Sequence, residues 1–202
     1  MLGGASGAGK SSIGGEMVRA KGADYYNPDE AAAKLRERDP EVSDADSRAW
    51  NEGIALLDRA IDQRLTFAFE TTLGGNTIPR RLQEAAALGI DVKVWFVGLA
   101  SPDLNIARVR TREASGGHRV DEDTIRKRYD ACRSNLITLI PFLAELRVYD
   151  NSEEGDPAAG AAPLPRLLLH MVQRKIVSMS APGETPDWVK PILAAAKNLA
   201  TA

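Results

Sequence analysis

Apolar residues recur along the chain in two spacings, and segments of the two kinds alternate. Apolar residues three or four positions apart predict helices, because they share one helix face. The predicted helices cover residues 10–21, 28–38, 44–64, 77–88, 102–114 and 122–146. In the third of these, Trp50, Ile54, Leu57 and Ile61 are expected on one face.

Short apolar runs fall between these helices and predict strands. Residues 66–70 (TFAFE), 92–99 (VKVWFVGL) and 147–150 (RVYD) are typical of buried parallel strands, and 24–27 is a weaker candidate. Further along, 167–172 and 175–179 predict a hairpin, and 186–199 a last helix. The run rich in Gly, Pro and Ala at 152–165 predicts a surface loop. Strands alternating with helices indicate an α/β sheet with helices on both faces.

Composition narrows the class of protein. A chain of 202 residues with 44% hydrophobic content can bury one sizeable core, so we expect a single domain over 1–202. The net charge of −2 gives no global basic field, and nucleic acid is not an expected partner. The single cysteine, Cys132, can form no internal disulfide and favours a reduced, cytoplasmic setting. No apolar run reaches the roughly 18 residues of a membrane span, so no membrane partner is expected.

The first residues, MLGGASGAGKSS, carry the most specific motif. Gly4, four residues, then Gly9, Lys10 and Ser11 match the phosphate-binding loop, in which backbone N–H groups and a helix N-terminus surround phosphate oxygens. Lys10 is expected to reach the β- and γ-phosphates of ATP, and the Ser11 hydroxyl to bind Mg²⁺. The predicted nucleotide-binding residues are Gly4, Ala5, Ser6, Gly7, Ala8, Gly9, Lys10, Ser11 and Ser12.

A buried strand normally precedes such a loop, yet only Met1, Leu2 and Gly3 do so here. The expected fold is therefore a three-layer, P-loop NTPase-type parallel sheet whose first strand is largely missing from this chain. Each apolar side chain lost from a central strand costs roughly 1.5–3 kcal/mol, against a total stability of about 5–15 kcal/mol. We hypothesise that the native protein begins several residues upstream. Mass spectrometry showing Met1 as the start in the native source would contradict this.

Polar residues follow three predicted strands: NPDE after the second, ETT after the third and DNS after the last. Helix capping explains the first group by itself, with Asn27 before Pro28 and acidic residues in the first turn. The functional interpretation rests on the position of these residues in the sheet, because α/β sheets bind ligands at the carboxyl ends of their strands. There, Asp29 is a candidate base that accepts the proton of a substrate hydroxyl.

A cationic segment around residues 108–130 predicts a lid that closes over a phosphate. Its Gly116-Gly117 pair predicts a hinge, and Arg119 and Arg128 are the candidates to stabilise charge on the γ-phosphate. Arg108 and Arg126 are expected on solvated helix faces. The remaining candidates are weaker: His118 as a phosphate ligand or hinge cap, His170 with no role, and Cys132 as a small buried residue.

Six stretches occur in the order GASGAGKSS, YYNPDE, FAFETTLGG, WFVGLASPDLNIARVRTREASGGHRV, IRKRYDACRSNL and VYDNS. Together they resemble the zeta-toxin-like P-loop kinases over residues 2 to about 152, with a weaker echo near 188–193. The resemblance implies that Lys10 binds ATP and Asp29 is the catalytic base. It implies that Glu70 and Thr72 hold the substrate, with Glu70 across the site from Lys10, and Asn27 is assigned to substrate binding beside them.

In that family, lid arginines contact the transferred phosphate, which points here to Arg119 and Arg128, and then to Arg112. Its best-known members phosphorylate a sugar hydroxyl of UDP-N-acetylglucosamine and are toxins held by an antitoxin. The chain departs from the usual Pro-Asn at Ala5-Ser6, where backbone N–H groups do the cradling.

The resemblance predicts an ATP- and Mg²⁺-dependent kinase acting on a small hydroxyl compound such as a nucleotide sugar, with an antitoxin as a candidate partner. Two alternatives stay open. One is a nucleotide-binding module without turnover that grips a partner protein. The other is a kinase acting on nucleic-acid ends, although the chain shows no basic groove interleaved with aromatic residues.

Overall fold

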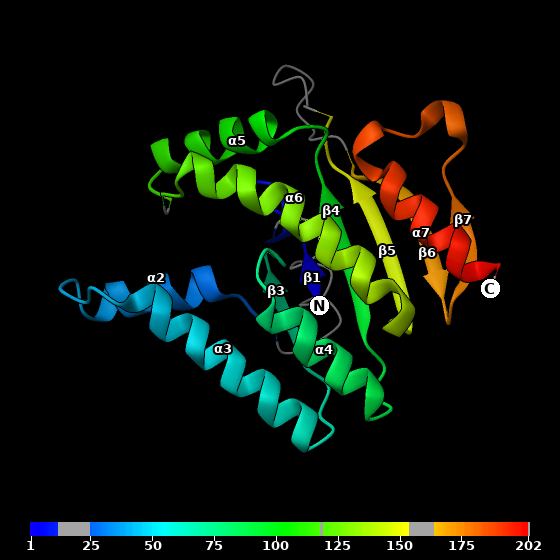
Figure 1. The fold of residues 1–202 in the computed structure, drawn as a ribbon. Coiled ribbons are helices and arrows are strands. Elements are labelled where there is room, and N and C mark those ends of the chain that lie inside the picture. Colours follow the sequence, from blue (N-terminus) through cyan, green and yellow to red (C-terminus); the bar gives the residue numbers. More distant parts are fainter. Residues whose placement is uncertain (12–24, 118, 154–163, 202) are drawn as a thin grey trace.

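The computed structural model describes residues 1–11, 25–117, 119–153 and 164–201. Over these ranges one sheet has seven strands in the order β2-β3-β1-β4-β5-β6-β7 (Figure 1). The first five strands of that order are parallel, whereas β6 and β7 are antiparallel to their neighbours. The strands are β1 Leu2–Gly3, β2 Tyr25–Tyr26, β3 Ala68–Thr71, β4 Lys93–Gly98, β5 Glu145–Asp150, β6 Arg166–Val172 and β7 Lys175–Met179. The predicted α/β sheet and terminal hairpin are confirmed.

Helices flank this sheet, and α4, α6 and α7 lie on the near side of it in Figure 1. The described helices are α2 Pro28–Arg38, α3 Ala45–Asp62, α4 Thr77–Ala87, α5 Pro102–Ala114, α6 Glu122–Leu139 and α7 Lys190–Ala200. Capping marks the starts of α2, α5 and α6: the Asn27, Ser101 and Asp121 side chains each accept a hydrogen bond from a backbone N–H of the first turn. The helix predicted at 10–21 falls almost wholly outside the described residues.

Three predicted boundaries in the second half of the chain are wrong. Helix α6 ends at Leu139 instead of continuing to 146, because Pro141 has no N–H to donate and its ring blocks a further helical turn. The chain makes a 3₁₀ turn over Ile140–Phe142, and β5 then starts two residues before the predicted 147. The last helix starts at Lys190, after a 3₁₀ turn over Asp187–Val189.

The first strand is as short as expected. Leu2 pairs with Glu70 of β3 and with Trp95 of β4, so β1 sits inside the sheet with two residues. A cavity of about 610 Å³ lies beside Met1 at the amino ends of these strands, with Phe67 and Leu82 among its lining residues. The short β1 therefore leads straight into the glycine-rich loop at the carboxyl edge of the sheet.

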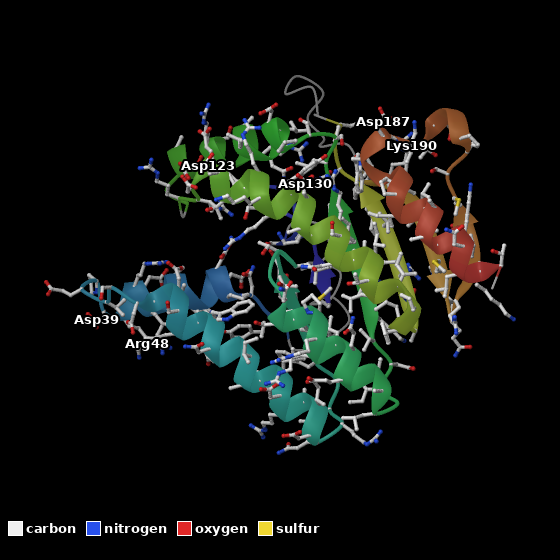
Figure 2. All side chains as sticks on the ribbon, in the orientation of Figure 1. Asp39, Arg48, Asp123, Asp130, Asp187 and Lys190 are labelled. Carbon is white, nitrogen blue, oxygen red and sulfur yellow. The ribbon has the colours of Figure 1, made fainter. Side chains whose placement is uncertain are left out.

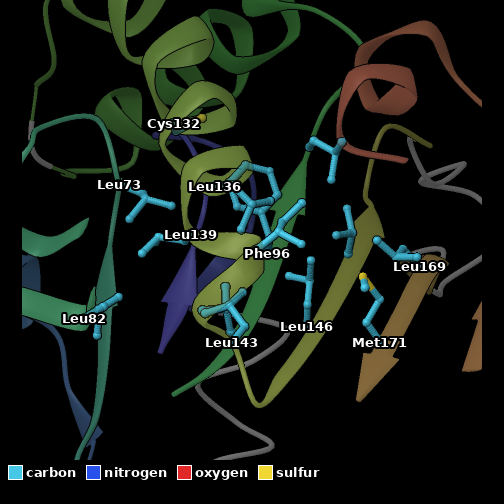
Figure 3. Close-up of a cluster of buried hydrophobic side chains, with 14 of the residues drawn as sticks. Leu73, Leu82, Phe96, Cys132, Leu136, Leu139, Leu143, Leu146, Leu169 and Met171 are labelled. Atoms are coloured by element: carbon cyan, nitrogen blue, oxygen red, sulfur yellow. The ribbon is translucent and has the colours of Figure 1, made fainter. Parts of the chain in front are cut away.

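The main core lies between the sheet and α4, α6 and α7 (Figure 3). This core cluster includes Leu136 and Leu139 of α6, Phe96 of β4 and Leu169 of β6. The terminal hairpin is thus part of the core that supports the loop. Charged side chains such as Asp39, Arg48 and Asp123 project from the outer helix surfaces (Figure 2).

No helix in the described part of the chain is long and apolar enough to cross a membrane.

Candidate active site

Two asparagines fix the backbone of the glycine-rich loop. Asn105 of α5 is fully buried, and its Nδ2 donates to the Ser6 carbonyl at 2.6 Å. Asn151, directly after β5, donates to the Ala8 carbonyl at 3.0 Å. Gly7 has φ +80°, and a Cβ there would come within 2.6 Å of the Asn105 carbonyl oxygen, so glycine is required. The two hydrogen bonds therefore fix the backbone conformation of the loop at Ser6 and Ala8.

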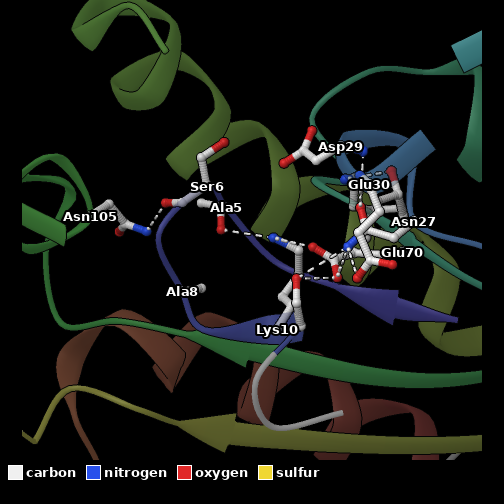
Figure 4. A network of polar contacts seen from close by, with 12 residues as sticks. Ala5, Ser6, Ala8, Lys10, Asn27, Asp29, Glu30, Glu70 and Asn105 are labelled. Carbon is white, nitrogen blue, oxygen red and sulfur yellow. Dashed lines mark hydrogen bonds and ion pairs between the residues drawn. The ribbon is translucent and has the colours of Figure 1, made fainter. Parts of the chain in front are cut away.

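Lys10 and Glu70 form a buried ion pair at the end of this loop (Figure 4). Lys10 Nζ lies 3.4 Å from Glu70 Oε1 and donates to the Ala5 carbonyl at 3.2 Å. Ser11 Oγ donates to Glu70 Oε2 at 2.8 Å, and the Tyr25 hydroxyl donates to the same oxygen at 2.5 Å. The expectation that Glu70 stands across the site from Lys10 is therefore wrong, because parallel pairing of β1 and β3 brings the end of β3 beside the loop.

These contacts set the charge of Glu70. Burial by itself would raise the pKa of its carboxyl, but the Lys10 ammonium and the hydrogen bonds from Tyr25 and Ser11 outweigh burial and lower the pKa below its ordinary value. Glu70 is thus an anion at neutral pH. Its oxygens and the Ser11 hydroxyl form a compact oxygen-rich corner next to a fixed cation.

Asn27 and Asp29, which follow β2, make different contacts. The Asn27 side chain caps α2, accepting from the Asp29 N–H at 2.9 Å, and its Nδ2 lies 3.5 Å from Glu70 Oε2. Asp29 is exposed, and Arg112 Nη1 of α5 lies 3.8 Å from its Oδ2. Figure 4 shows Asp29 beside this cluster with its carboxylate turned toward the loop. The Asn27 side chain thus contacts α2 and Glu70, whereas the Asp29 carboxylate is exposed and lies near Arg112.

One cavity of about 800 Å³ joins these groups. The predicted site residues that line it are Ser6, Gly7, Gly9, Lys10, Ser11, Asn27, Asp29, Glu70, Thr72, Arg119 and Arg128. Gly4, Ala5 and Ala8 belong to the loop but do not line the cavity, and Ser12 is outside the described residues. The residue types and the size suit an anionic ligand larger than a phosphate.

Three arginines of the segment predicted to be a lid line this cavity, namely Arg112, Arg119 and Arg128. Arg112 was the weakest of the three candidates on sequence, yet it is the one that reaches Asp29. Arg108 and Arg126 do not line the cavity: the first donates to the Glu153 carbonyl at 3.3 Å and the second pairs with Asp103. Their expected place on outer helix faces agrees with these contacts.

The other flagged residues lie elsewhere. His170 Nε2 is 3.1 Å from Glu145 within the sheet, Cys132 is buried, and His118 is not among the described residues. Burial raises the pKa of the Cys132 thiol to about 11, so it is not a nucleophile at neutral pH. Asp150, flagged after β5, accepts from the Trp188 indole N–H at 3.3 Å and holds the C-terminal part.

One wall of the cavity was missed on sequence. Asp46, Ser47, Trp50 and Asn51 of α3 line it, and Trp50 is 40% exposed. Trp50 lines the cavity, while α3 packs on its buried side through the small side chains of Ala45 and Ala49. The only sequence feature that marks the four wall residues is their helical spacing at 46, 47, 50 and 51, which puts the four side chains on one face.

In the described residues, no group of three or more His, Cys, Asp or Glu side chains is placed to hold a metal ion by itself. Any cation at the Ser11 and Glu70 corner would need further ligands from a bound molecule, as Mg²⁺ commonly does with phosphates.

Solved structures share this fold at low sequence identity. A chain of the AvrRxo1-ORF1:-ORF2 complex with ATP aligns with a TM-score of 0.66 and 14% identity, covering 96% of this chain and 62% of its own length. A chain of the PezAT toxin-antitoxin system of Streptococcus pneumoniae aligns with a TM-score of 0.57 and 14% identity, covering 98% of this chain and 82% of its own. The present chain thus spans less than two thirds of the first of these. The likeness agrees with the predicted P-loop type of α/β fold.

No family model matches the chain. A protein of Haemophilus influenzae, described as an uncharacterized protein, is 33% identical over 129 residues, which are 62% of this chain and 88% of that protein. This identity extends over most of the relative's length. The chain belongs to the same protein family as this Haemophilus influenzae protein.

Proposed function

We propose that the chain is an ATP- and Mg²⁺-dependent kinase, a single domain over residues 1–202, that phosphorylates a hydroxyl of a small molecule. A nucleotide sugar is the first candidate acceptor. One observation carries the proposal: the buried Lys10 of the phosphate-binding loop and the exposed carboxylate of Asp29 line the same cavity. A cation for the phosphate and a base for the acceptor are the two groups that phosphoryl transfer needs.

In the proposed reaction, Asp29 takes the proton from the acceptor hydroxyl as its oxygen forms a bond to the γ-phosphorus of ATP. The bond from that phosphorus to the bridging oxygen breaks, and ADP leaves. Lys10 accompanies the charge that develops on the phosphate oxygens, with Arg112, Arg119 or Arg128 on the open side. Asn105 and Asn151 keep the loop in the shape this requires.

The Ser11 hydroxyl and the Glu70 carboxylate, 2.8 Å apart, fit the oxygen ligands of Mg²⁺. When bound there with the phosphates of ATP, Mg²⁺ would neutralise charge on the β- and γ-oxygens. Glu70 then serves the nucleotide end of the cavity, which leaves Thr72 as the substrate contact supplied by the end of β3.

The second candidate is a nucleotide-binding module of a toxin–antitoxin pair that turns over little or no ATP. It is favoured by the fold neighbours, one solved as a two-protein complex with ATP and one as a toxin-antitoxin system. In both readings a partner protein is a proposal for this chain.

Steady-state ADP formation separates the two candidates. For the kinase we expect ADP to form slowly with ATP and Mg²⁺ alone and to rise when an acceptor from a panel of nucleotide sugars and small alcohols is added. Tight ATP binding with no turnover on any acceptor would instead support the module, and absence of ATP binding would overturn both.

A further inference from the structure

Arg119 lies in the connection between α5 and α6 and lines the cavity together with Lys10. Figure 1 shows the two helices side by side, with this connection at the end farther from the sheet. Arg112, at the end of α5, reaches Asp29, whereas the Arg119 side chain makes no ion pair or hydrogen bond among the described residues. A guanidinium in that state, in the same cavity as the lysine of a phosphate-binding loop, is available for an anionic ligand.

The last turn of α5 fixes the beginning of this connection. The Gly116 N–H donates to the Glu113 carbonyl at 2.9 Å, and the Gly117 N–H donates to the Arg112 carbonyl at 2.9 Å. Gly116 has φ +89°, so the two hydrogen bonds form a glycine C-cap. A Cβ on Gly117 would lie 2.6 Å from Arg112 Cγ. The two glycines therefore end the helix in a close-packed turn, and the backbone leads to Arg119 from a fixed point.

Glu113 fixes the other end of the connection. Its Oε1 accepts a hydrogen bond from the Val120 N–H at 2.8 Å, and this N–H belongs to the peptide group that joins Arg119 to Val120. The Val120 side chain packs with Val109 of α5 and Ile125 of α6. The backbone at Arg119 therefore cannot turn away from the cavity without breaking the hydrogen bond to Glu113.

We infer that Glu113 is a positioning residue, which holds Arg119 where its guanidinium can contact the γ-phosphate of ATP. The inference rests on the proposed function, because it needs a nucleotide phosphate in the cavity. An arginine loses conformational freedom when it binds an anion, and a backbone that is fixed in advance reduces that loss. Glu113 acts through the acceptor oxygen of its side chain and not through its charge.

Binding of two nucleotides in the presence of Mg²⁺ tests this without turnover. β,γ-Imido-ATP carries a γ-phosphate that is not transferred, whereas ADP carries none. In calorimetry we expect Glu113→Ala to bind β,γ-imido-ATP roughly tenfold more weakly than the wild type does, and to bind ADP equally well. Glu113→Gln should bind both nucleotides as the wild type does, because its side-chain oxygen can accept the same hydrogen bond.

A double-mutant cycle shows whether Glu113 acts through Arg119. Arg119→Ala should weaken the binding of β,γ-imido-ATP at least as much as Glu113→Ala does, and the double variant should bind no more weakly than Arg119→Ala alone. Glu122→Ala is a matched control, because Glu122 is another carboxylate of this helix pair, pairs with Arg110 and does not line the cavity. It should bind both nucleotides as the wild type does. Thermal melts check that each variant is folded at the temperature of the titration.

Failure of the inference differs from failure of the proposed function. Wild-type affinity of Glu113→Ala or Arg119→Ala for β,γ-imido-ATP, an equal loss in Glu113→Gln, or a further loss in the double variant would overturn the inference. A loss of ADP affinity in Glu113→Ala that matches the loss for β,γ-imido-ATP would also overturn it. In each of these cases Lys10-dependent turnover would still support the kinase. If the wild type binds neither nucleotide, the proposed function and the inference both fail.

Discussion

At the scale of single residues, Asp29 decides whether the site is catalytic. Asp29→Asn keeps the size of the side chain and cannot accept a proton. We expect the variant to keep ATP affinity and melting temperature and to lose roughly 10²–10⁴ in kcat, the usual contribution of a general base. A first-turn helix residue alone would cost at most about 1 kcal/mol of stability and leave turnover unchanged. Wild-type kcat on the true acceptor would sink the proposed mechanism.

Glu70 gives a residue-scale prediction about pH. Its folded-state pKa is lowered from the ordinary 4.5, so the stability it contributes is present above about pH 4.5 and is lost as the pH falls through the folded value. Glu70→Gln lacks the charge opposite Lys10. We expect a lower melting temperature for this variant near neutral pH and a difference that shrinks below about pH 4.5. Thermal melts across this range measure it, and a difference that does not change with pH would contradict the buried ion pair.

At the scale of elements, the turn that follows β3 contacts Arg128 of α6, which lines the cavity. A Cβ at Gly74 would lie 2.7 Å from Cγ of Arg128. Because Cγ is close to the backbone of Arg128, an alanine at position 74 would displace the whole Arg128 side chain. Gly75 has no atom within 4 Å of its added Cβ. We expect Gly74→Ala to lower kcat with little change in ATP affinity, and Gly75→Ala to change neither. Equal kcat in the two variants would show that the placement of Arg128 does not matter.

The helix boundaries also show which features of the fold a sequence pattern predicts. The starts of α2, α5 and α6 were predicted within one residue because a local cap and a proline or acidic first turn mark each. The end of α6 was missed because apolar residues continue at helical spacing past Pro141, where a backbone rule outweighs periodicity.

At the scale of the whole molecule, local sequence predicts one part of the site, and the packing of distant elements decides the other part. The loop and Asp29 follow strand ends, so local motifs and sheet topology together predicted their place at one edge. The contact between Lys10 and Glu70, the two asparagines behind the loop and the Trp50 wall depend on how distant elements pack. No local pattern marks those contacts, and periodicity cannot tell whether an apolar helix face such as that of Trp50 meets the core or a cavity.

Transfer of labelled phosphate from γ-labelled ATP to the acceptor panel tests the central claim most directly. The wild type should label at least one acceptor of the panel. Lys10→Ala, checked by its melting temperature to be folded, should label none, because it lacks the cation that follows charge onto the γ-phosphate. Labelling by Lys10→Ala at the wild-type rate, or no labelled acceptor with the wild type, would contradict the assignment of this site as a kinase.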